Sequence, residues 1–172
     1  RTGNAITLTD LLEEIPIDAA RFFFNMREPG SAFDFDLDLA VSQTSENPVY
    51  YVQYAHARIC SILKNLAAEG ICVGCAAAEQ LLLLTDPAER ELVRALAQFP
   101  EEIVAAAKNY DPARVTHYAV ELANRFHRFY NACRCKCGDD DLMAARVTLC
   151  LAVKQTLENV LSMLHITAPE TM

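Results

Sequence analysis

Glycine is scarce in this chain, and so are the sequence motifs that are typical of enzyme active sites. Among 172 residues there are only five glycines, and none belongs to a glycine-rich loop of the kind that binds phosphate. There is no His-Glu helical motif for a metal, and no serine or cysteine lies in a recognisable nucleophile motif. Few glycines, many alanines and leucines and few β-branched runs favour helix. These patterns predict a helical binding or interaction module.

Long hydrophobic runs are absent as well. The two most apolar stretches, Ile71 to Ala78 and Leu81 to Leu84, are far too short to span a bilayer. The chain begins with Arg1 and not with Met, and no basic-then-apolar leader opens it, so we expect a fragment or processed chain without a signal peptide. Its seven cysteines are an odd number and fit reduced thiols better than a disulfide framework. We predict a soluble, cytoplasmic protein with no membrane partner.

Positive charge is also in short supply. The formal net charge is −8 at pH 7, which argues against a generic nucleic-acid binder, because phosphate affinity needs clustered Lys and Arg. The charges are unevenly distributed, however. Residues 1–46 carry three basic and nine acidic side chains, whereas residues 114–136 carry five basic side chains against Glu121 alone. Any RNA binding must therefore come from a local site.

Helix starts are marked clearly in the second part of the chain. Three pairs of a capping side chain and a proline predict helix N-termini: Asn47-Pro48, Asp86-Pro87 and Asp111-Pro112. Glu89, three residues after Asp86, completes the pattern of a capping box. Phe99-Pro100 with two following glutamates predicts a further start.

Apolar residues at helical spacing extend from these starts. They predict helices over residues 48–69, 87–98, 100–109 and 112–132, and a last long helix after the aspartates at 139–141. Helices joined by short connections imply an antiparallel bundle, so the predicted fold class is all-α. With 52% hydrophobic residues the chain can bury a sizeable core.

The first 46 residues differ from the rest. Caps at Thr7 and Asp18 predict two short helices, the second from Ala19 to Met26, and Phe33 to Leu39 reads as a short strand or as the entry to a helix. We predict a division into residues 1–46 and a helical bundle at 47–172. The first segment lacks a large apolar stripe, so we expect it to pack loosely on the bundle and to exchange its amide hydrogens faster.

The first candidate site lies between Tyr50 and Arg58. Tyr54 and Arg58 are four residues apart, so on a helix both project from one face, one turn apart. A ring and a guanidinium plane side by side make a good surface for an unstacked base. From spacing alone, a tyrosine half-packed on the core beside a solvated arginine is the commoner arrangement.

A second candidate surface lies on the predicted helix over residues 112–132. Arg125 and Arg128 lie beside its apolar stripe, with tyrosines and histidines interleaved, as a face that follows a phosphate backbone requires. A mixed face of this kind is more commonly only solvated.

Five cysteines near predicted loops raise the question of a metal: Cys72, Cys75, Cys133, Cys135 and Cys137. Four thiolates can hold a zinc ion if the two loops meet, but the spacing of the second group is not that of a standard zinc knuckle. We expect no metal. A zinc-stabilised domain, which a chelator would unfold, is kept as an alternative.

The run Asn-Pro-Val-Tyr-Tyr-Val-Gln-Tyr-Ala-His-Ala-Arg at residues 47–58 closely resembles the opening helix of the DALR-type anticodon-binding domain of arginyl-tRNA synthetases. Other stretches resemble family segments in the same order: Phe99-Pro100, Tyr118 to Ala123, Phe126 to Tyr130 and Ala168 to Met172. Upstream, Arg1 to Leu8 resembles the sequence at and after the Lys-Met-Ser-Lys-type loop of class I synthetases, and Asp18 to Phe23 the helical segment that follows it. The resemblance covers nearly the whole chain.

The resemblance implies the C-terminal part of an enzyme that joins arginine to its tRNA with ATP and Mg²⁺. The His-Ile-Gly-His-type signature is absent, so the fragment alone should be inactive and hold no cofactor. In the family, the positions of Tyr54, Arg58 and Met172 surround the middle cytosine of arginine anticodons. Arg125, Arg128 and Arg134 become candidates for RNA backbone contact, and His165 stands where the family usually has glycine.

The partners implied are arginine tRNA and the chain's own catalytic domain, in a monomeric enzyme. The principal alternative is a helical protein–protein scaffold without an RNA role, which the overall acidity would suit.

Overall fold

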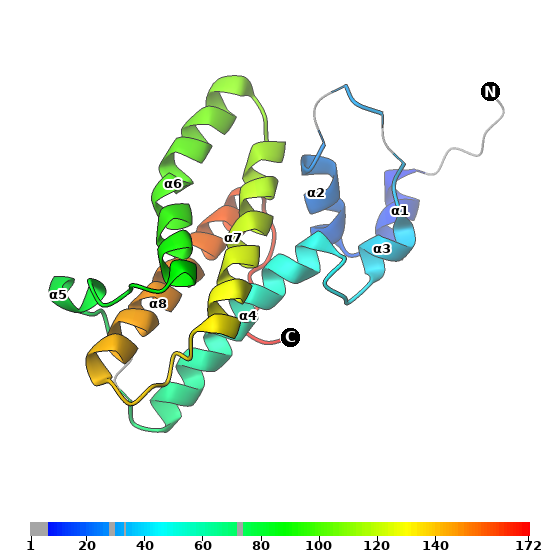
Figure 1. Ribbon diagram of the computed structural model, residues 1–172. Coiled ribbons are helices and arrows are strands. Elements are labelled where there is room, and N and C mark those ends of the chain that lie inside the picture. Colours follow the sequence, from blue (N-terminus) through cyan, green and yellow to red (C-terminus); the bar gives the residue numbers. More distant parts are fainter. Residues whose placement is uncertain (1–6, 28–29, 33, 72–73) are drawn as a thin grey trace.

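The computed structural model describes residues 7–27, 30–32, 34–71 and 74–172 (Figure 1). This part of the chain is helical and contains no strand, so the predicted all-α fold class is confirmed. The helices, in chain order, are α1 (Leu8–Glu14), α2 (Ile17–Asn25), α3 (Leu37–Val41), α4 (Pro48–Ala68), α5 (Ala78–Leu81), α6 (Pro87–Asn109), α7 (Ala113–Ala132) and α8 (Asp140–Met163). None of these described helices is long and apolar enough to cross a membrane.

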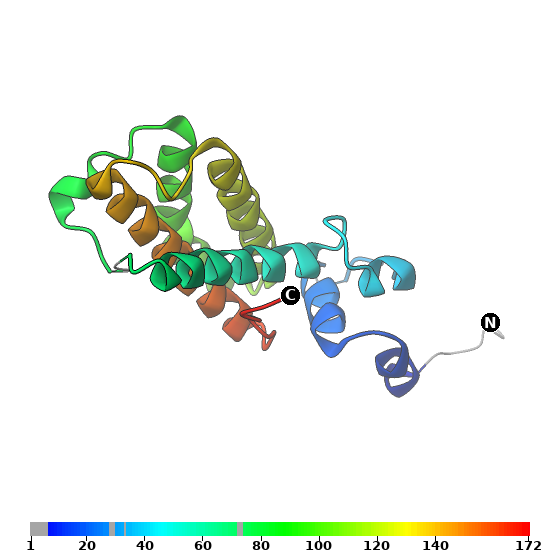
Figure 2. The same ribbon diagram turned by 90° about the horizontal axis from the view of Figure 1, so that it is seen from below.

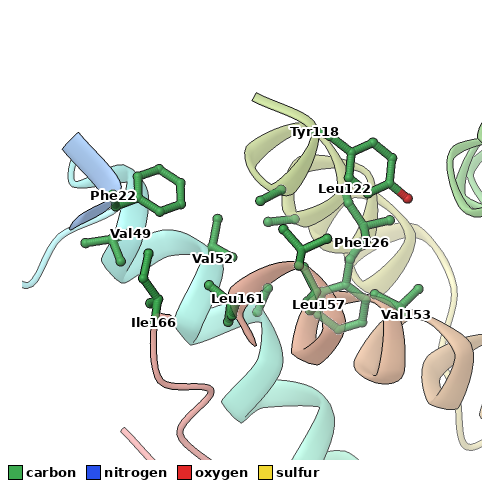
Figure 3. Close-up of a cluster of buried hydrophobic side chains, with 14 of the residues drawn as sticks. Phe22, Val49, Val52, Tyr118, Leu122, Phe126, Val153, Leu157, Leu161 and Ile166 are labelled. Carbon is green, nitrogen blue, oxygen red and sulfur yellow. The ribbon is translucent and has the colours of Figure 1, made fainter. Parts of the chain in front are cut away.

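Four long helices, α4, α6, α7 and α8, form the bundle (Figure 1). The Asn47 side chain caps α4, and the chain leaves this helix through Gly70 at φ 77°, a left-handed conformation that favours glycine. The apolar stripes predicted for α7 and α8 face the core, where Leu122, Phe126 and Leu157 are fully buried (Figure 3). The positions of α4, α7 and α8 and the start of α6 were therefore predictable from caps and periodicity.

The predicted break at Phe99-Pro100 is wrong, because α6 continues through Pro100. The face of α6 that packs on the core is in register on both sides of the proline, with Leu92 and Ala95 before it and Ala106 after it. The Phe99 ring stacks on Tyr118 of α7 at a centroid distance of 5.3 Å. The stabilisation from packing along the whole face of α6 is thus larger than the stabilisation lost with the one backbone hydrogen bond that a proline removes.

Helices α1 to α3 lie at the end of the bundle where α4 begins (Figure 2). The stretch before α3 is the entry to a helix and not a strand: Asp36 caps α3 by accepting a hydrogen bond from the Leu39 amide. Asp18 does not cap α2, which begins one residue earlier at Ile17; its carboxylate bonds to Thr167 near the end of the chain. The stretch Arg1–Ile6 lies outside the described residues.

The expectation that the first segment lacks an apolar stripe is wrong for α2. Ala19, Ala20, Phe22 and Phe23 of α2 are buried and belong to the same hydrophobic core as the bundle. In Figure 3 the Phe22 ring lies beside Val49 of α4. The spacing of these residues is helical, but the stripe is short and was hidden among acidic neighbours. The division at residue 46 itself stays a prediction.

Candidate nucleic-acid interface

One pocket of about 400 Å³ is lined by Tyr54, Arg58 and Met172. Tyr54 and Arg58 are one helical turn apart on α4, and Met172 is the last residue of the chain. Helix α4 supplies most of its lining, α7 supplies Tyr130, and the last two residues of the chain line it as well. The lining residues are Tyr54, Ala57, Arg58, Ser61, Ile62, Asn65, Tyr130, Thr171 and Met172. The side chains combine aromatic rings with hydrogen-bonding groups, which is the composition that recognition of a single base needs.

Arg58 lies between two rings. Its guanidinium carbon is 4.6 Å from the centroid of the Tyr54 ring and 4.7 Å from that of Tyr130. The guanidinium also donates a hydrogen bond to the Tyr54 hydroxyl. Tyr54 and Arg58 are therefore stacked on each other, and not side by side as predicted from their spacing. The two rings hold the cation in one orientation by cation–π attraction and reduce the entropy that it loses on binding a ligand.

Tyr130 is the aromatic pocket residue that the sequence did not single out as a site residue. It was grouped with the arginines of its helix, because only the packing of α7 against α4 brings its ring over Arg58. Tyr130 follows Phe129, the last buried residue of α7, by one position, and this position gave no signal of the contact.

Behind Tyr54 the rings continue in a stack. Tyr50 lies nearly parallel to Tyr54, with an interplanar angle of 6° and a centroid distance of 6.2 Å, and the His127 ring is 5.9 Å away. Burial, together with the charge of Arg58, lowers the pKa of His127 to about 4. His127 is therefore neutral at physiological pH and adds no second positive charge beside Arg58.

The shifted pKa of His127 predicts a change of stability with pH. The ordinary value is 6.5, so between pH 6.5 and about 4 the unfolded chain binds more protons than the folded one at this residue. This contribution to the free energy of unfolding is fully present above pH 6.5 and falls as the pH is lowered through that window. His127→Phe keeps the ring and removes the titration.

Denaturant unfolding of both proteins at several pH values between 4.5 and 7 measures the effect. Relative to the phenylalanine variant, the native protein should lose stability steadily as the pH falls. A difference between the two that stays constant across the series would contradict the assignment.

The three arginines proposed for backbone contact are placed differently. The Arg125 side chain is engaged by Glu121, at 2.7 Å, and by the backbone carbonyl of Glu91. Arg128 and Arg134 are exposed at the surface. Arg128 is therefore better placed than Arg125 to meet a phosphate near the pocket, and the contact itself stays a prediction.

The cysteines considered for a zinc site lie in different surroundings. Cys72 lies outside the described residues, and among those described no three His, Cys, Asp or Glu side chains are grouped to hold a metal ion. Cys133 and Cys135 are buried in the core, Cys75 is exposed, and the Cys137 thiol donates to the Asp139 carbonyl. Two thiols of the second group are thus core residues.

The structure thus defines an all-helical bundle with one pocket built from a stacked cation and aromatic rings. The family model "DALR anticodon binding domain" matches residues 52–172, and the chain belongs to that family. The arginine–tRNA ligase of Caldanaerobacter subterraneus subsp. tengcongensis is 54% identical over all 172 residues, and that of Acetivibrio thermocellus is 52% identical. The chain spans 31% and 30% of the length of these relatives.

Solved structures agree with this assignment. The chain resembles the arginyl-tRNA synthetase of Thermus thermophilus with a TM-score of 0.74 and 30% identity, over 98% of this chain and 28% of the other. It resembles that of Plasmodium falciparum in fold, with a TM-score of 0.79 at 23% identity, over 97% of this chain and 29% of the other. The resemblance to arginyl-tRNA synthetases stated from the sequence is confirmed, and the anticodon-binding hypothesis is favoured over the scaffold.

Proposed function

We propose that this chain is the anticodon-binding part of an arginyl-tRNA synthetase and that its pocket receives the middle cytosine of an arginine anticodon. The observation that supports this most directly is Arg58, held between Tyr54 and Tyr130 at the mouth of a pocket in a domain of the anticodon-binding family. The remainder of the synthetase would supply ATP and Mg²⁺ binding and the transfer of arginine. A monomeric, cytoplasmic enzyme stays a prediction.

The chemistry of the pocket suits cytosine. The Watson–Crick edge of cytosine presents two acceptors, N3 and O2, and a guanidinium offers only donors. Uracil presents an N–H at position 3, which would face the donors of Arg58 without an acceptor between them. Tyr130 and Met172 provide apolar surface against which the base can pack. Arg58 would therefore read the edge of the base while the rings and the Met172 side chain cover its faces.

Replacing Arg58 by alanine should weaken binding of an arginine-tRNA anticodon stem-loop by about 1–3 kcal/mol, because the donors to the base edge are lost. Changing the middle cytosine of the loop to uracil should cost the native protein a similar amount. A titration of both loops at fixed low salt measures these differences. Arg94→Ala is a matched control, since Arg94 is an exposed arginine on α6 outside the pocket.

In the Arg58→Ala protein the two loops should bind almost equally, because the residue that distinguishes them is gone. If the native protein binds both loops with equal affinity, this pocket does not recognise the middle base. A complete lack of salt-sensitive binding to any loop would favour the protein–protein scaffold.

A further inference from the structure

The last eight residues form a strap that runs from the end of α8 to the pocket. We use this name for residues 165–172. The strap begins at His165, which adopts φ 54°, a left-handed conformation that favours glycine and explains why glycine is usual there in the family. Ile166 is buried in the core, and Thr171 and Met172 line the pocket. The strap therefore supplies one wall of the pocket, and its path decides where that wall stands.

Helix α2 and the start of α4 hold the first part of the strap. Arg21 donates a hydrogen bond to the His165 carbonyl, and the Asp18 carboxylate accepts one from the Thr167 amide at 3.2 Å. From the other side, the Gln53 amide donates to the Thr167 carbonyl at 2.9 Å and to Asp18 at 3.1 Å. This part of the strap is fixed at two points, His165 and Thr167.

His56 holds the strap closer to the pocket. The residue is fully buried, at 0% exposure, and lies one turn after Val52 on the same helix as Tyr54 and Arg58. Its Nδ1 is 2.8 Å from the Pro169 carbonyl oxygen, and its Nε2 is 3.1 Å from Oε1 of Glu158 on α8. The carbonyl oxygen can only accept, so Nδ1 must carry a proton and donate it. Nε2 must also donate if Glu158 is ionised.

The surroundings of His56 favour an ionised Glu158. Lys154 donates a hydrogen bond to the same carboxylate. Burial acts to raise the pKa of Glu158, but the hydrogen bonds from Lys154 and His56 outweigh it, and the net pKa is lowered. The Cys60 thiol lies 3.9 Å from both ring nitrogens, and Glu170 of the strap adds a further negative charge near Cys60 and Lys154. His56 thus joins α4, α8 and the strap in one hydrogen-bonded chain.

The position of this anchor along the strap matters for the pocket. Met172 is three residues beyond Pro169, and an extended chain advances about 3.3–3.6 Å per residue, so the anchor confines Met172 to within about 10 Å of it. Without the bond to Pro169, the nearest strap residue with a described hydrogen bond is Thr167, five residues before Met172. The volume open to Met172 then grows, and its effective concentration at the pocket falls by at least about twofold from chain length alone.

We propose that His56 is a positioning residue for the base pocket: through its bond to Pro169 it places Met172 beside Tyr54 and Arg58. The proposal rests on the proposed function of that pocket. His56 does not touch the base, so its effect on recognition must pass through the strap. A purely structural role, in which His56 only pairs with Glu158 inside the bundle, predicts instead that both loops lose affinity equally or not at all.

Two substitutions separate these roles, because they keep different halves of the imidazole. In His56→Asn the side-chain amide nitrogen replaces Nδ1, so the bond to Pro169 can form and the contact with Glu158 is lost. In His56→Gln the amide nitrogen replaces Nε2, so the contact with Glu158 can form and the bond to Pro169 is lost. Gln155→Ala is the control, since Gln155 is exposed on α8 and bonds only its neighbour Asn159 among the described contacts.

The first measurement is the NMR order parameter of the backbone amides of residues 170–172 in the RNA-free protein, which reports their mobility directly. We expect it to fall below about 0.6 in His56→Gln and to stay higher in the native protein, in His56→Asn and in the control. The second is the ratio of affinities for the stem-loops with cytosine and with uracil in the middle position. This ratio should fall about three- to tenfold in His56→Gln and stay close to the native value in His56→Asn.

A double substitution tests whether His56 acts through the strap. In a Met172→Ala background, His56→Gln should not lower the cytosine-to-uracil ratio further, because the wall that it positions is already missing. An additive loss would overturn the proposal, and so would an unchanged order parameter at residues 170–172 in His56→Gln. Failure of the native protein to discriminate the two loops would instead refute the proposed function. The order parameters of residues 170–172 would still show whether His56 holds the strap.

Discussion

Replacing Glu89 by alanine is expected to lower the free energy of unfolding by about 3–5 kcal/mol. The Glu89 carboxylate is 1% exposed, and it pairs at 2.7 Å with Arg146 of α8, whose side chain is 14% exposed. The other carboxylate oxygen accepts the Asp86 amide in the capping box that starts α6. Alanine would leave the Arg146 charge buried without its partner and would also remove part of the cap.

Chemical denaturation of the Glu89→Ala protein measures this loss, and two further variants identify its cause. Glu89→Gln removes the charge and keeps one of the two acceptor oxygens, for either Arg146 or the Asp86 amide, so its loss should be smaller than that of alanine. The double variant Glu89→Met with Arg146→Met removes both charges and should recover much of the stability, because hydrophobic replacements of buried pairs are often tolerated. A loss below about 1 kcal/mol in Glu89→Ala would show that water reaches the pair and screens it.

Replacing Phe22 by alanine is expected to lower the free energy of unfolding by about 3–5 kcal/mol as well. Phe22 is 0% exposed and belongs to the core shared by α2 and the bundle, where Figure 3 shows it next to Val49. The substitution removes a buried ring and leaves a cavity at the junction between the first segment and α4. Phe24 of the same helix is 46% exposed, so Phe24→Ala is the matched control, with an expected loss below about 1 kcal/mol.

The same two variants decide how the first segment is attached. If α2 is part of the cooperative core, its amides exchange as slowly as those of α4 in the native protein, and Phe22→Ala lowers protection in both helices. Fast exchange over residues 17–25 in the native protein, with little loss of stability in Phe22→Ala, would restore the prediction of loose packing made from the sequence.

Much of the bundle was determined by local sequence signals. Asn47 with Pro48 and Asp86 with Pro87 mark helix starts because a side-chain acceptor and a preset φ satisfy the first turn without help from the rest of the chain. The stripes of α7 and α8 were readable because each is long, so many residues repeat the same period. The pairing of Tyr54 with Arg58 followed from helical spacing alone.

Other features of the fold came from tertiary structure, because the local sequence signals predicted them wrongly or did not encode them. Pro100 carries the local signal of a break, but continuous packing of α6 on α7 keeps the helix intact. Asp18 carries the signal of a cap, but its carboxylate serves the strap, 149 residues away in sequence. Tyr130 stacks on Arg58 only because α7 packs against α4.

The sequence by itself thus determined most starts of the long helices, the acidic balance and the helix face that carries Tyr54 and Arg58, since these depend on neighbours within a few residues. Only the tertiary structure decided that Arg58 is stacked between two rings and that residues 171–172 close the pocket. It also decided that buried His56 holds the strap at Pro169. These contacts join segments distant in the chain, and their geometry comes from the packing of whole helices, which no local pattern encodes.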